Sequence, residues 1–433
     1  MIVNPAWKGR RYAVLGLARS GRATVEALLA SGADVLAWDD REDARAPFVG
    51  RIAIADPLQS DLTGYDGVVV SPGVPLNTHP IKPHADSFGV PVIGDIELFA
   101  QARKHLPPHK VVGITGTNGK STTTALVHHI LKTAGIPTTM GGNIGLPILE
   151  QEPLPEGGVY VLELSSYQID LTYSLDCDVA VLLNITPDHL DRYDGDFAKY
   201  SAAKARLFYM QSANQIAVIS ELDDEASHVA DVMVHSRGAY WQMGDFHPET
   251  YKTGQSFWPS LQGPHNASNA AAAIRVTQAF GLSEEGIENG LRSFAGLPHR
   301  MERVAEISDV AFVNDSKGTN AAASAPALAA FDKIHWILGG LAKEPGLAEC
   351  EAELGHVKAA YTIGKAGPDF AALLEGRVPV EQCETLDRAV TSAAAKAEAG
   401  DTVLLSPACA SFDQYQDFEK RGEHFRALVE GLK

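Results

Sequence analysis

Short apolar runs alternate along the chain with longer stretches in which apolar residues recur at helical spacing. In the first part of the chain such runs stand at residues 11–16, 34–38 and 67–70, each followed by a turn containing glycine, aspartate or proline. Wholly apolar strands are typical of parallel sheets covered on both faces, and alternating strands and helices build such sheets. The pattern predicts an α/β protein.

The same alternation recurs in two later parts of the chain. A length of 433 residues corresponds to about two to four domains, each able to bury its own core. A Pro-Pro pair near residue 108 and a break near residue 298 interrupt the pattern. We therefore predict three α/β domains: a Rossmann-like domain over residues 1–98, a central P-loop ATPase-like parallel sheet over residues 99–298, and a second Rossmann-like domain over residues 299–433.

The segment 113–124 (GITGTNGKSTTT) lies between an apolar strand and an amphipathic helix. Its glycines let backbone N–H groups converge on phosphate oxygens, and the helix N-terminus adds partial positive charge. Lys120 is placed to reach the β- and γ-phosphates, and the hydroxyl of Ser121 or Thr122 to bind Mg²⁺. The glycine spacing is one residue longer than in the general P-loop, so a turn that merely caps a helix is the alternative.

The turn at residues 16–21 (GLARSG) is a variant of the dinucleotide-binding fingerprint. Asp39 and Asp40 follow the next strand, where an acid that binds a ribose is expected. The motif supports a Rossmann-like fold more strongly than it supports a ligand. NAD and any other nucleotide diphosphate fit it equally well.

Polar side chains stand at the ends of strands in the central domain. Glu163 ends the run 159–163, one strand away from the P-loop, where a residue that binds Mg²⁺ or orders water belongs. A solvated strand end is an equal alternative for Glu163. His189 follows the next apolar run, and this position favours a place in the site over a purely structural role.

Lys204 is the most informative residue of the segment 196–208. It falls on the apolar stripe formed by Phe197, Tyr200 and Leu207 at helical spacing. A lysine facing a core is costly unless it is paired, neutralised or chemically modified. The alternative is a lysine that extends its ammonium group past the edge of the apolar face.

Further candidates occur towards the C-terminus. Asn266 has the position of an N-cap before an alanine-rich helix, which leaves Asn269, one turn further, as a ligand candidate. In the last domain, glycine, hydroxyl and cationic residues follow three apolar runs, at 311–314, 334–338 and 402–406. They predict a ligand-binding edge of an open α/β sheet.

Composition and charge narrow the class of protein. Hydrophobic residues make up 45% of the chain and charged residues 21%, and the formal net charge is −18. This charge argues against binding of nucleic acid, so local cations in a cleft must attract any anionic substrate. Four cysteines without CxxC spacing indicate reduced thiols. The chain also lacks a signal-peptide core and a run of about 18 apolar residues, and we expect a cytoplasmic protein without a membrane span.

Taken together, five motifs resemble those of the Mur ligase superfamily of ATP-dependent amide-forming enzymes, whose P-loop has the longer glycine spacing. They are residues 115–122, Glu163 with the two serines that follow it, residues 184–189, residues 265–269, and His299 with Arg300. Within the superfamily, residues 315–320 (DSKGTN) and 405–415 (LSPACASFDQY) are similar to the branch that adds D-glutamate. Gly318 is a mild departure, because alanine is common there. The Asp-Asn-Pro-Arg motif of the diaminopimelate- and lysine-adding branches is absent from the sequence.

The resemblance implies an activity as well as a fold. The N-terminal domain would bind the UDP moiety of UDP-N-acetylmuramoyl-L-alanine, the central domain would bind ATP, and the C-terminal domain would bring D-glutamate. The reaction would pass through an acyl phosphate and use two Mg²⁺ ions. The resemblance places this step in cytoplasmic peptidoglycan precursor synthesis, and we expect a monomer.

Residue roles follow from the same resemblance. The residues expected to carry the chemistry are Lys120, Glu163, His189 and Lys204. ATP would be held by Gly116, Thr117, Asn118, Gly119, Lys120, Ser121, Thr122, Asn269, Arg300 and Asp315, and Mg²⁺ by Ser121, Glu163, His189 and Lys204 as its carbamate. The UDP substrate would be held by Leu17, Ala18, Arg19, Asp39, Asp40, Arg41, Ser71, Gly73, Asn143 and His189. D-Glutamate would be held by Lys317, Thr319, Lys343, Ser411, Phe412 and Phe418.

Three other functions compete with this interpretation. An NAD-dependent oxidoreductase would account for residues 16–21 and Asp39 but would leave the P-loop, Glu163 and Lys204 unexplained. A P-loop switch or motor protein would hydrolyse ATP without an amino acid or a UDP-sugar. A folylpolyglutamate-type ligase also adds glutamate, but that family lacks a UDP-binding N-terminal domain.

Overall fold

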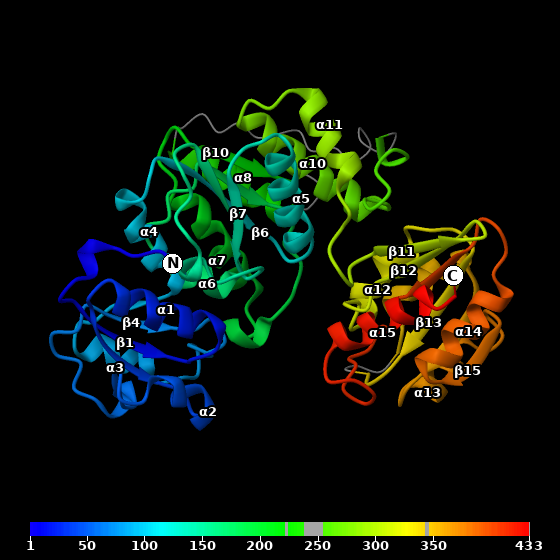
Figure 1. The fold of residues 1–433 in the computed structure, drawn as a ribbon, viewed down its shortest axis with the longest axis horizontal. Coiled ribbons are helices and arrows are strands. Elements are labelled where there is room, and N and C mark those ends of the chain that lie inside the picture. Colours follow the sequence, from blue (N-terminus) through cyan, green and yellow to red (C-terminus); the bar gives the residue numbers. More distant parts are fainter. Residues whose placement is uncertain (221–223, 238–253, 343–345, 433) are drawn as a thin grey trace. The chain divides into compact units, whose positions relative to one another are not determined.

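The chain forms three β-sheets, each accompanied by α-helices (Figure 1), which confirms the predicted α/β class. The computed structural model describes residues 1–220, 224–237, 254–342 and 346–432, with the backbone alone for 231–237. The chain divides into two compact units, one formed by Met1–His247 with Ala272–Gly290 and the other by Pro248–Ala271 with Leu291–Lys433. The first unit contains two sheets and the second contains one.

The first sheet is parallel throughout, with strand order β3-β2-β1-β4-β5. The strand order reverses at β1, which pairs with both β2 and β4, and ligand crevices of open α/β sheets lie at such points. Its strands are β1 (Arg11–Leu15), β2 (Asp34–Trp38), β3 (Ala53–Ile54), β4 (Gly67–Val70) and β5 (Val92–Ile93). Its helices are α1 (Arg19–Ala30), α2 (Glu42–Arg45), α3 (Ile81–Ser87) and α4 (Asp95–Ala102).

The close approach of α1 to β1 depends on two glycines. Gly16, directly after β1, has φ +88°, a conformation that side chains disfavour. A Cβ atom at Gly21 would lie 1.8 Å from the Gly16 carbonyl oxygen. The hydroxyl of Ser71, just after β4, donates to the same oxygen at 2.8 Å. The turn between β1 and α1 is therefore fixed from two sides.

The second sheet is also parallel, with strand order β10-β9-β6-β8-β7. The central strand β6 carries the P-loop at its carboxyl end. The strands are β6 (His109–Thr115), β7 (Thr138–Gly142), β8 (Gly158–Glu163), β9 (Val179–Leu182) and β10 (Ile216–Ile219). The helices are α5 (Lys120–Thr133), α6 (Ser166–Asp170), α7 (Phe197–Tyr209) and α8 (Asp224–Arg237), with α10 (Pro264–Ala279) and α11 (Glu284–Ser293) further on.

The third sheet has strand order β11-β12-β16-β13-β14-β15. The edge strand β11 is antiparallel to β12 and mostly half-buried, so it lacks the apolar run that marks the parallel strands. The strands are β11 (Glu302–Ile307), β12 (Val310–Asn314), β13 (Ile334–Gly339), β14 (Val357–Ile363), β15 (Val380–Glu384) and β16 (Thr402–Leu405). The helices are α12 (Ala321–Leu328), α13 (Gly367–Leu374), α14 (Leu386–Lys396) and α15 (Phe418–Glu430).

The predicted N-cap role of Asn266 is wrong. Helix α10 already begins at Pro264, and proline is favoured at the first helical position because its missing N–H needs no partner there. Asn266 therefore lies inside the helix, where its side-chain amide donates to the Gln262 carbonyl at 3.0 Å. All four cysteines are buried and free of disulfides. Across the described ranges, every helix is too short or too polar to cross a membrane.

We predict that Gly21→Ala lowers the free energy of unfolding by about 2 kcal/mol or more, because its methyl group overlaps the Gly16 carbonyl and forces α1 away from β1. Urea unfolding followed by circular dichroism measures this. Gly355→Ala is the matched control, since no atom lies within 4 Å of the added Cβ and its φ is not positive. Equal stabilities of the two variants would contradict the packing argument.

Candidate active site

The P-loop, Glu163 and the segment that contains His189 emerge from three neighbouring strands of the second sheet. Strand β6 lies between β8 and β9, with Ile114 opposite Glu163 and Thr115 opposite Leu182. Carboxyl ends of parallel strands meet at one edge of a sheet, and ligands bind there. The register therefore places these three segments side by side.

The P-loop is held by the segment after β9. The backbone N–H of Asn118 donates to the Asn184 side chain at 2.8 Å, and the Asn184 amide returns a hydrogen bond to the Asn118 carbonyl at 3.2 Å. The Thr117 hydroxyl accepts from the Thr186 N–H at 3.0 Å. Gly116, with φ +151°, passes close to Leu183, where a Cβ would lie 3.0 Å from the leucine Cβ. These contacts join the P-loop to the segment after β9.

Lys120 and Lys204 both donate to the loop at Gly116. The Lys120 ammonium lies 2.9 Å from the Gly116 carbonyl oxygen and 2.7 Å from that of Thr117. The Lys204 ammonium lies 2.8 Å from the same Gly116 oxygen. Ser121 is buried and Thr122 half-buried at the start of α5. Two lysines and the helix N-terminus therefore concentrate positive charge where phosphates would bind.

Lys204 is buried in the core, as its helical spacing predicts, with 1% of its surface exposed. Its ammonium group lies 4.5 Å from the centre of the Tyr200 ring. Within the described residues no carboxylate forms an ion pair with it. Burial, and secondarily the charge of Lys120, lowers the pKa of Lys204 well below its ordinary value, although Asp188 and Asp170 oppose the shift. The neutral amine is therefore easier to form at Lys204 than at an exposed lysine.

Glu163 is buried with one oxygen satisfied and one not. Its Oε1 accepts from the Asn143 side chain at 3.0 Å, while its Oε2 is buried and has no hydrogen-bond partner in the described part of the chain. A buried carboxylate oxygen without a partner is costly. A cation bound to Oε2 would remove that cost, so the residue fits Mg²⁺.

The described residues contain no group of three or more His, Cys, Asp or Glu side chains that could hold a metal alone. Mg²⁺ at phosphate-transfer sites usually takes one or two carboxylates, with water and phosphate oxygens completing its shell. Ser121 and Glu163 meet that requirement only if a nucleotide supplies oxygens. The donor set fits Mg²⁺ bound together with a nucleotide.

His189 lies at the same sheet edge, but within the described part of the chain its side chain forms no hydrogen bond or ion pair with Ser121, Glu163 or Lys204. Its backbone is left-handed, with φ +51°, and its side chain is 60% exposed. Its ring lies 5.7 Å from that of Tyr167, edge to face, and its Nε2 lies 3.6 Å from Asp188. The side chain is therefore oriented towards solvent and available to a ligand.

The expected ribose-binding acid of the first sheet is already engaged by its own loop. The Leu17 N–H donates to Asp39 at 2.7 Å and the Arg41 N–H at 3.0 Å. Burial raises the pKa of the Asp39 carboxyl, but these two donors and the Arg41 charge outweigh it, so the net pKa is lowered. Asp39 thus shapes the turn, and a direct bond from it to a ribose would have to replace one of these contacts.

The other residues predicted for the UDP substrate surround that turn. Ala18 is the N-cap of α1 and makes no side-chain cap, which leaves the helix N-terminus available to a diphosphate. Asp40 accepts from Trp38 at 3.3 Å, and Arg19 donates to the Gly145 carbonyl at 2.8 Å. Ser71 and Gly73 lie on the loop after β4.

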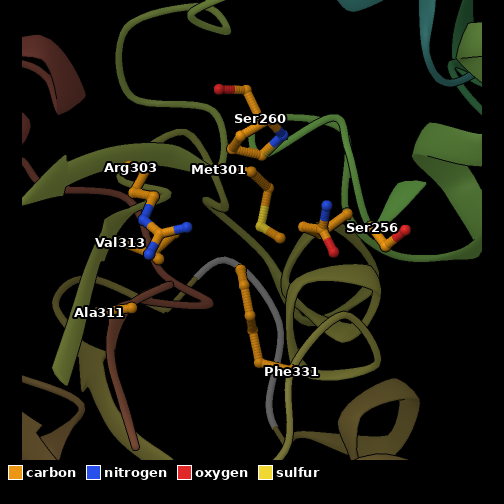
Figure 2. Close-up of a pocket in the computed structure, with 9 residues that line it drawn as sticks. Ser256, Ser260, Met301, Arg303, Ala311, Val313 and Phe331 are labelled. Atoms are coloured by element: carbon orange, nitrogen blue, oxygen red, sulfur yellow. The ribbon is translucent and has the colours of Figure 1, made fainter. Parts of the chain in front are cut away.

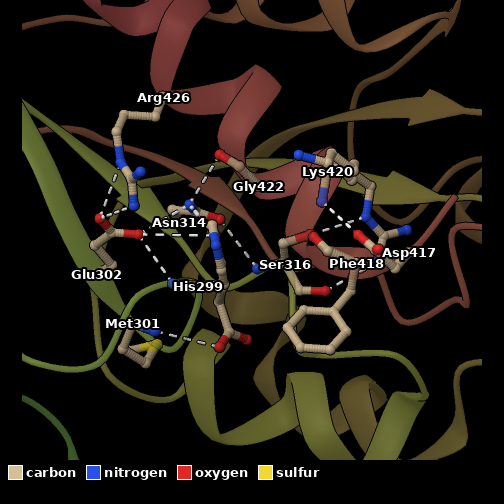
Figure 3. A network of polar contacts seen from close by, with 12 residues as sticks. His299, Met301, Glu302, Asn314, Ser316, Asp417, Phe418, Lys420, Gly422 and Arg426 are labelled. Carbon is tan, nitrogen blue, oxygen red and sulfur yellow. Dashed lines mark hydrogen bonds and ion pairs between the residues drawn. The ribbon is translucent and has the colours of Figure 1, made fainter. Parts of the chain in front are cut away.

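In the second unit, a network around His299 fixes the segment that carries Arg300 (Figure 3). The His299 N–H donates to Glu302 at 2.9 Å, and the Asn314 amide donates to the His299 ring at 3.0 Å and to the Gly422 carbonyl at 3.1 Å. Gly422 permits this, because a Cβ there would lie 2.1 Å from the ring. Arg300 is half-buried between His299 and Met301, both of left-handed backbone.

Asp315 is buried and accepts from Ser406 at 2.7 Å and from the Met301 N–H at 3.3 Å. Burial raises the pKa of Asp315 to about 7, although these hydrogen bonds and the charge of Arg300 oppose the shift. Asn269, also buried, donates to Asn266 at 3.1 Å. The three predicted nucleotide ligands Asn269, Arg300 and Asp315 therefore all lie in the second unit.

Two of the residues predicted for D-glutamate are brought together. The Lys317 ammonium lies 3.8 Å from the centre of the Phe418 ring. Ser411 is buried, and the neighbouring Phe412 exposes 67% of its surface. Thr319 follows Lys317 on the same loop, and Lys343 lies outside the described residues.

A cavity of about 280 Å³ in the second unit adjoins this region without containing it. Figure 2 shows Met301, Arg303 and Phe331 directed towards its centre. Met301 contacts Asp315 through its N–H, but no residue predicted for the site lines the cavity. This cavity is therefore separate from the residues predicted for the site.

Sequence reasoning missed several residues that hold the site. Arg421 is buried in α15 and donates to Ser316 and to the Cys409 carbonyl at 2.9 and 3.0 Å. No pattern marks it, because charged residues are ordinary in an amphipathic helix. Tyr200, whose hydroxyl lies 3.1 Å from that of Thr117, was visible only as part of an apolar stripe.

Comparison with known proteins agrees with the sequence motifs. Residues 114–277 match the Mur ligase middle domain, and residues 299–409 match the Mur ligase, glutamate ligase domain. The chain is 62% identical to UDP-N-acetylmuramoylalanine–D-glutamate ligase of Novosphingobium aromaticivorans, over all of this chain and 97% of the relative. It is 60% identical to the ligase of the same name from Sphingopyxis alaskensis, over the full length of both.

The fold is also similar to that of solved structures. The MurF ligase from Thermotoga maritima in complex with ADP superposes with a TM-score of 0.60 at 17% identity, covering 99% of this chain and 97% of that one. At this identity the likeness shows the fold alone.

We predict that Asp315 makes stability depend on pH. Its folded pKa of about 7 lies above the ordinary 3.8, so between these values the folded chain holds a proton that the unfolded chain has released. The contribution of Asp315 to stability therefore falls as the pH rises towards 7. Urea midpoints from pH 5 to 8 should fall in the wild type relative to Asp315→Asn, whereas parallel curves would show that Asp315 is already ionised when folded.

Proposed function

Because this chain belongs to the Mur ligase family, we propose that it joins D-glutamate to the carboxyl group of UDP-N-acetylmuramoyl-L-alanine with hydrolysis of ATP to ADP and phosphate. Relatives that bear the name of this reaction match the chain from end to end at 60% identity or more. The structural observation that carries the proposal is the P-loop edge of the second sheet. It combines two lysines on one carbonyl with a buried glutamate whose Oε2 has no partner among the described residues.

The chemistry explains why cations gather at this edge. The substrate carboxylate oxygen attacks the γ-phosphorus of ATP, the bond to the bridging oxygen breaks, and ADP leaves. Attack of an anion on an anion requires charge screening, which Lys120 and Arg300 would supply. The D-glutamate amine then attacks the acyl carbon, and phosphate and a proton leave. We expect domain closure during turnover, because water would hydrolyse the acyl phosphate.

The family uses ATP with Mg²⁺. We propose two Mg²⁺ sites held by Ser121, Glu163, His189 and carbamylated Lys204, where the metal would neutralise charge on the phosphate oxygens. We propose that ten residues hold ATP itself. These are Gly116, Thr117, Asn118, Gly119, Lys120, Ser121, Thr122, Asn269, Arg300 and Asp315.

The environment of Lys204 suits the carbamate. Its amine is buried, and its lowered pKa favours the neutral form, which can attack CO₂. A nitrogen–carbon bond forms and a proton is released, so a buried cation becomes an anion with two oxygens. The product would stand beside Lys120, which opposes a cation at this position and would stabilise an anion.

The remaining substrate contacts follow the domain order. We propose that the UDP substrate lies along the first sheet, with Asn143 and His189 near its sugar-peptide end, and that D-glutamate lies on the third sheet. We further propose a cytoplasmic monomer. The UDP contacts are Leu17, Ala18, Arg19, Asp39, Asp40, Arg41, Ser71 and Gly73, and the D-glutamate contacts are Lys317, Thr319, Lys343, Ser411, Phe412 and Phe418.

The competing functions are less well supported. The NAD interpretation gives no role to the P-loop, to the buried Glu163 or to the buried Lys204. The folylpolyglutamate-type interpretation does not account for full-length identity with D-glutamate ligases. A bare ATPase would leave the first sheet without a role.

Phosphate release from ATP tests the function directly. With UDP-N-acetylmuramoyl-L-alanine present, we expect release that depends on D-glutamate and not on L-glutamate or meso-diaminopimelate. Release without any amino acid would favour an ATPase. Turnover with another amino acid would agree with membership of the family but would contradict the proposal that the third sheet binds D-glutamate.

We predict that Lys204→Ala lowers kcat at least about 100-fold, the scale of losing one group that stabilises charge in the transition state. Added formate or acetate should restore part of the rate, because a small carboxylate can occupy the space of the carbamate. Chloride at equal concentration is the control. Full activity of Lys204→Ala without added carboxylate would contradict the carbamate proposal.

A further inference from the structure

The loop after β4 and the turn that follows His189 are joined by one arginine side chain. Arg192 belongs to the short helix η6 (Leu190–Tyr193) of the second sheet's layer. Its guanidinium donates to the carbonyl oxygens of Pro72 at 2.9 Å and Gly73 at 3.4 Å. The Asn77 side chain adds a second link by donating to the Asp191 carbonyl at 2.9 Å. All of these residues lie within the first compact unit.

Arg192 makes no ion pair with a described carboxylate. Its guanidinium lies 4.3 Å from the centre of the Tyr167 ring. Ordering a long side chain costs rotamer entropy, and a lysine could not reproduce a planar group that stacks on a ring while donating to two carbonyls. The residue is therefore suited to holding two loops in a defined relation.

The two loops carry different parts of the proposed reaction. Ser71 and Gly73 stand where we place the UDP moiety, and the Ser71 hydroxyl also fixes the turn at Gly16. On the other side, the backbone N–H of Arg192 donates to the carbonyl of His189 at 3.0 Å. Arg192 thus contacts the UDP loop with its side chain and the His189 turn with its backbone.

A row of tyrosine rings continues from Arg192 to the P-loop. Tyr167 stacks on Tyr193 with ring centres 6.2 Å apart, and Tyr193 meets Tyr200 edge to face at 5.5 Å. The Tyr200 hydroxyl lies 3.1 Å from that of Thr117. Because these side chains contact one another in sequence, a displacement of the His189 turn would also displace Thr117 of the P-loop.

We propose that Arg192 is a positioning residue that couples occupancy of the UDP loop to ordering of His189 and the P-loop. Binding of the UDP substrate would fix the loop at residues 71–77, hold Arg192 in place, and so favour the arrangement that binds the nucleotide. Such coupling is reciprocal by linkage, so the nucleotide favours the UDP substrate equally. The inference rests on the proposed function.

Calorimetry of ADP binding, with Mg²⁺ and without D-glutamate, tests the coupling. In the wild type we expect UDP-N-acetylmuramoyl-L-alanine to tighten ADP binding about five- to tenfold, an ordinary size for coupling between sites. In Arg192→Gln the ratio of the two ADP dissociation constants should fall close to one while both ligands still bind. Asn77→Ala, which removes only the second link, should lower the ratio partway and guards against a misfolded Arg192 variant.

Arg11→Gln is the matched control. Arg11 also lies over a tyrosine ring, 4.4 Å from the centre of Tyr65, and donates to the Thr63 carbonyl at 3.4 Å, but at the start of β1. It should leave the ratio unchanged. An unchanged ratio in Arg192→Gln, a wild-type ratio of one, or an equal loss in Arg11→Gln would overturn the proposal.

The coupling and the proposed function fail in different ways. The ratio of ADP dissociation constants is measured without turnover. A wild type that couples the two ligands but releases no phosphate with D-glutamate would contradict D-glutamate as the acceptor. It would leave the coupling role of Arg192 intact. Steady-state kinetics then separates coupling from general damage. Arg192→Gln should raise KM for the UDP substrate about tenfold and leave KM for D-glutamate within about twofold, and a parallel rise in both would contradict a positioning role.

Discussion

The Gly116 carbonyl oxygen accepts hydrogen bonds from two lysine ammonium groups. The rest of the central site depends on this concentration of positive charge, because bound anions must compensate it. One of the two lysines is buried without an ion pair among the described residues, an arrangement that is costly in the absence of a compensating anion. Phosphates would compensate Lys120 from outside, and carbamylation would reverse the charge of Lys204 from within.

The neighbouring strands of the second sheet bring further groups to that charge or hold them in place. Parallel pairing of β6 with β8 and β9 places Glu163 and the Asn184 segment on either side of the loop. Asn118 and Asn184 then lock the loop by exchanging hydrogen bonds. In the second unit, the His299 network fixes Arg300 on a segment of left-handed backbone. Of the residues proposed to carry the chemistry, Lys120 begins α5, Glu163 ends β8 and Lys204 lies inside α7, so regular elements and buried polar contacts position them.

The sequence was sufficient for the fold class and for the strands with wholly apolar runs, because both depend on local patterns. For Lys204 it left two alternatives, burial or extension past the edge of the apolar face, and the structure shows burial. Sequence patterns did not predict features that lack a local apolar pattern or that depend on contacts between distant segments. The antiparallel edge strand β11 is half-buried and lacks an apolar run, and Asn266 was placed as a cap because the proline two residues earlier was not taken as the helix start. Arg192 and Arg421 act through backbone carbonyls of distant segments, and spacing along the chain contains no trace of such contacts.

The most direct test of the account is carbon-13 NMR of the protein in buffer with labelled bicarbonate, compared with Lys204→Ala. The account predicts a carbamate resonance in the wild type that is absent from the variant and that sharpens when Mg²⁺ and ADP bind. A spectrum indistinguishable from that of the variant would contradict it. Lys204 would then be an unmodified amine beside the P-loop, and the metal site would need another anionic ligand.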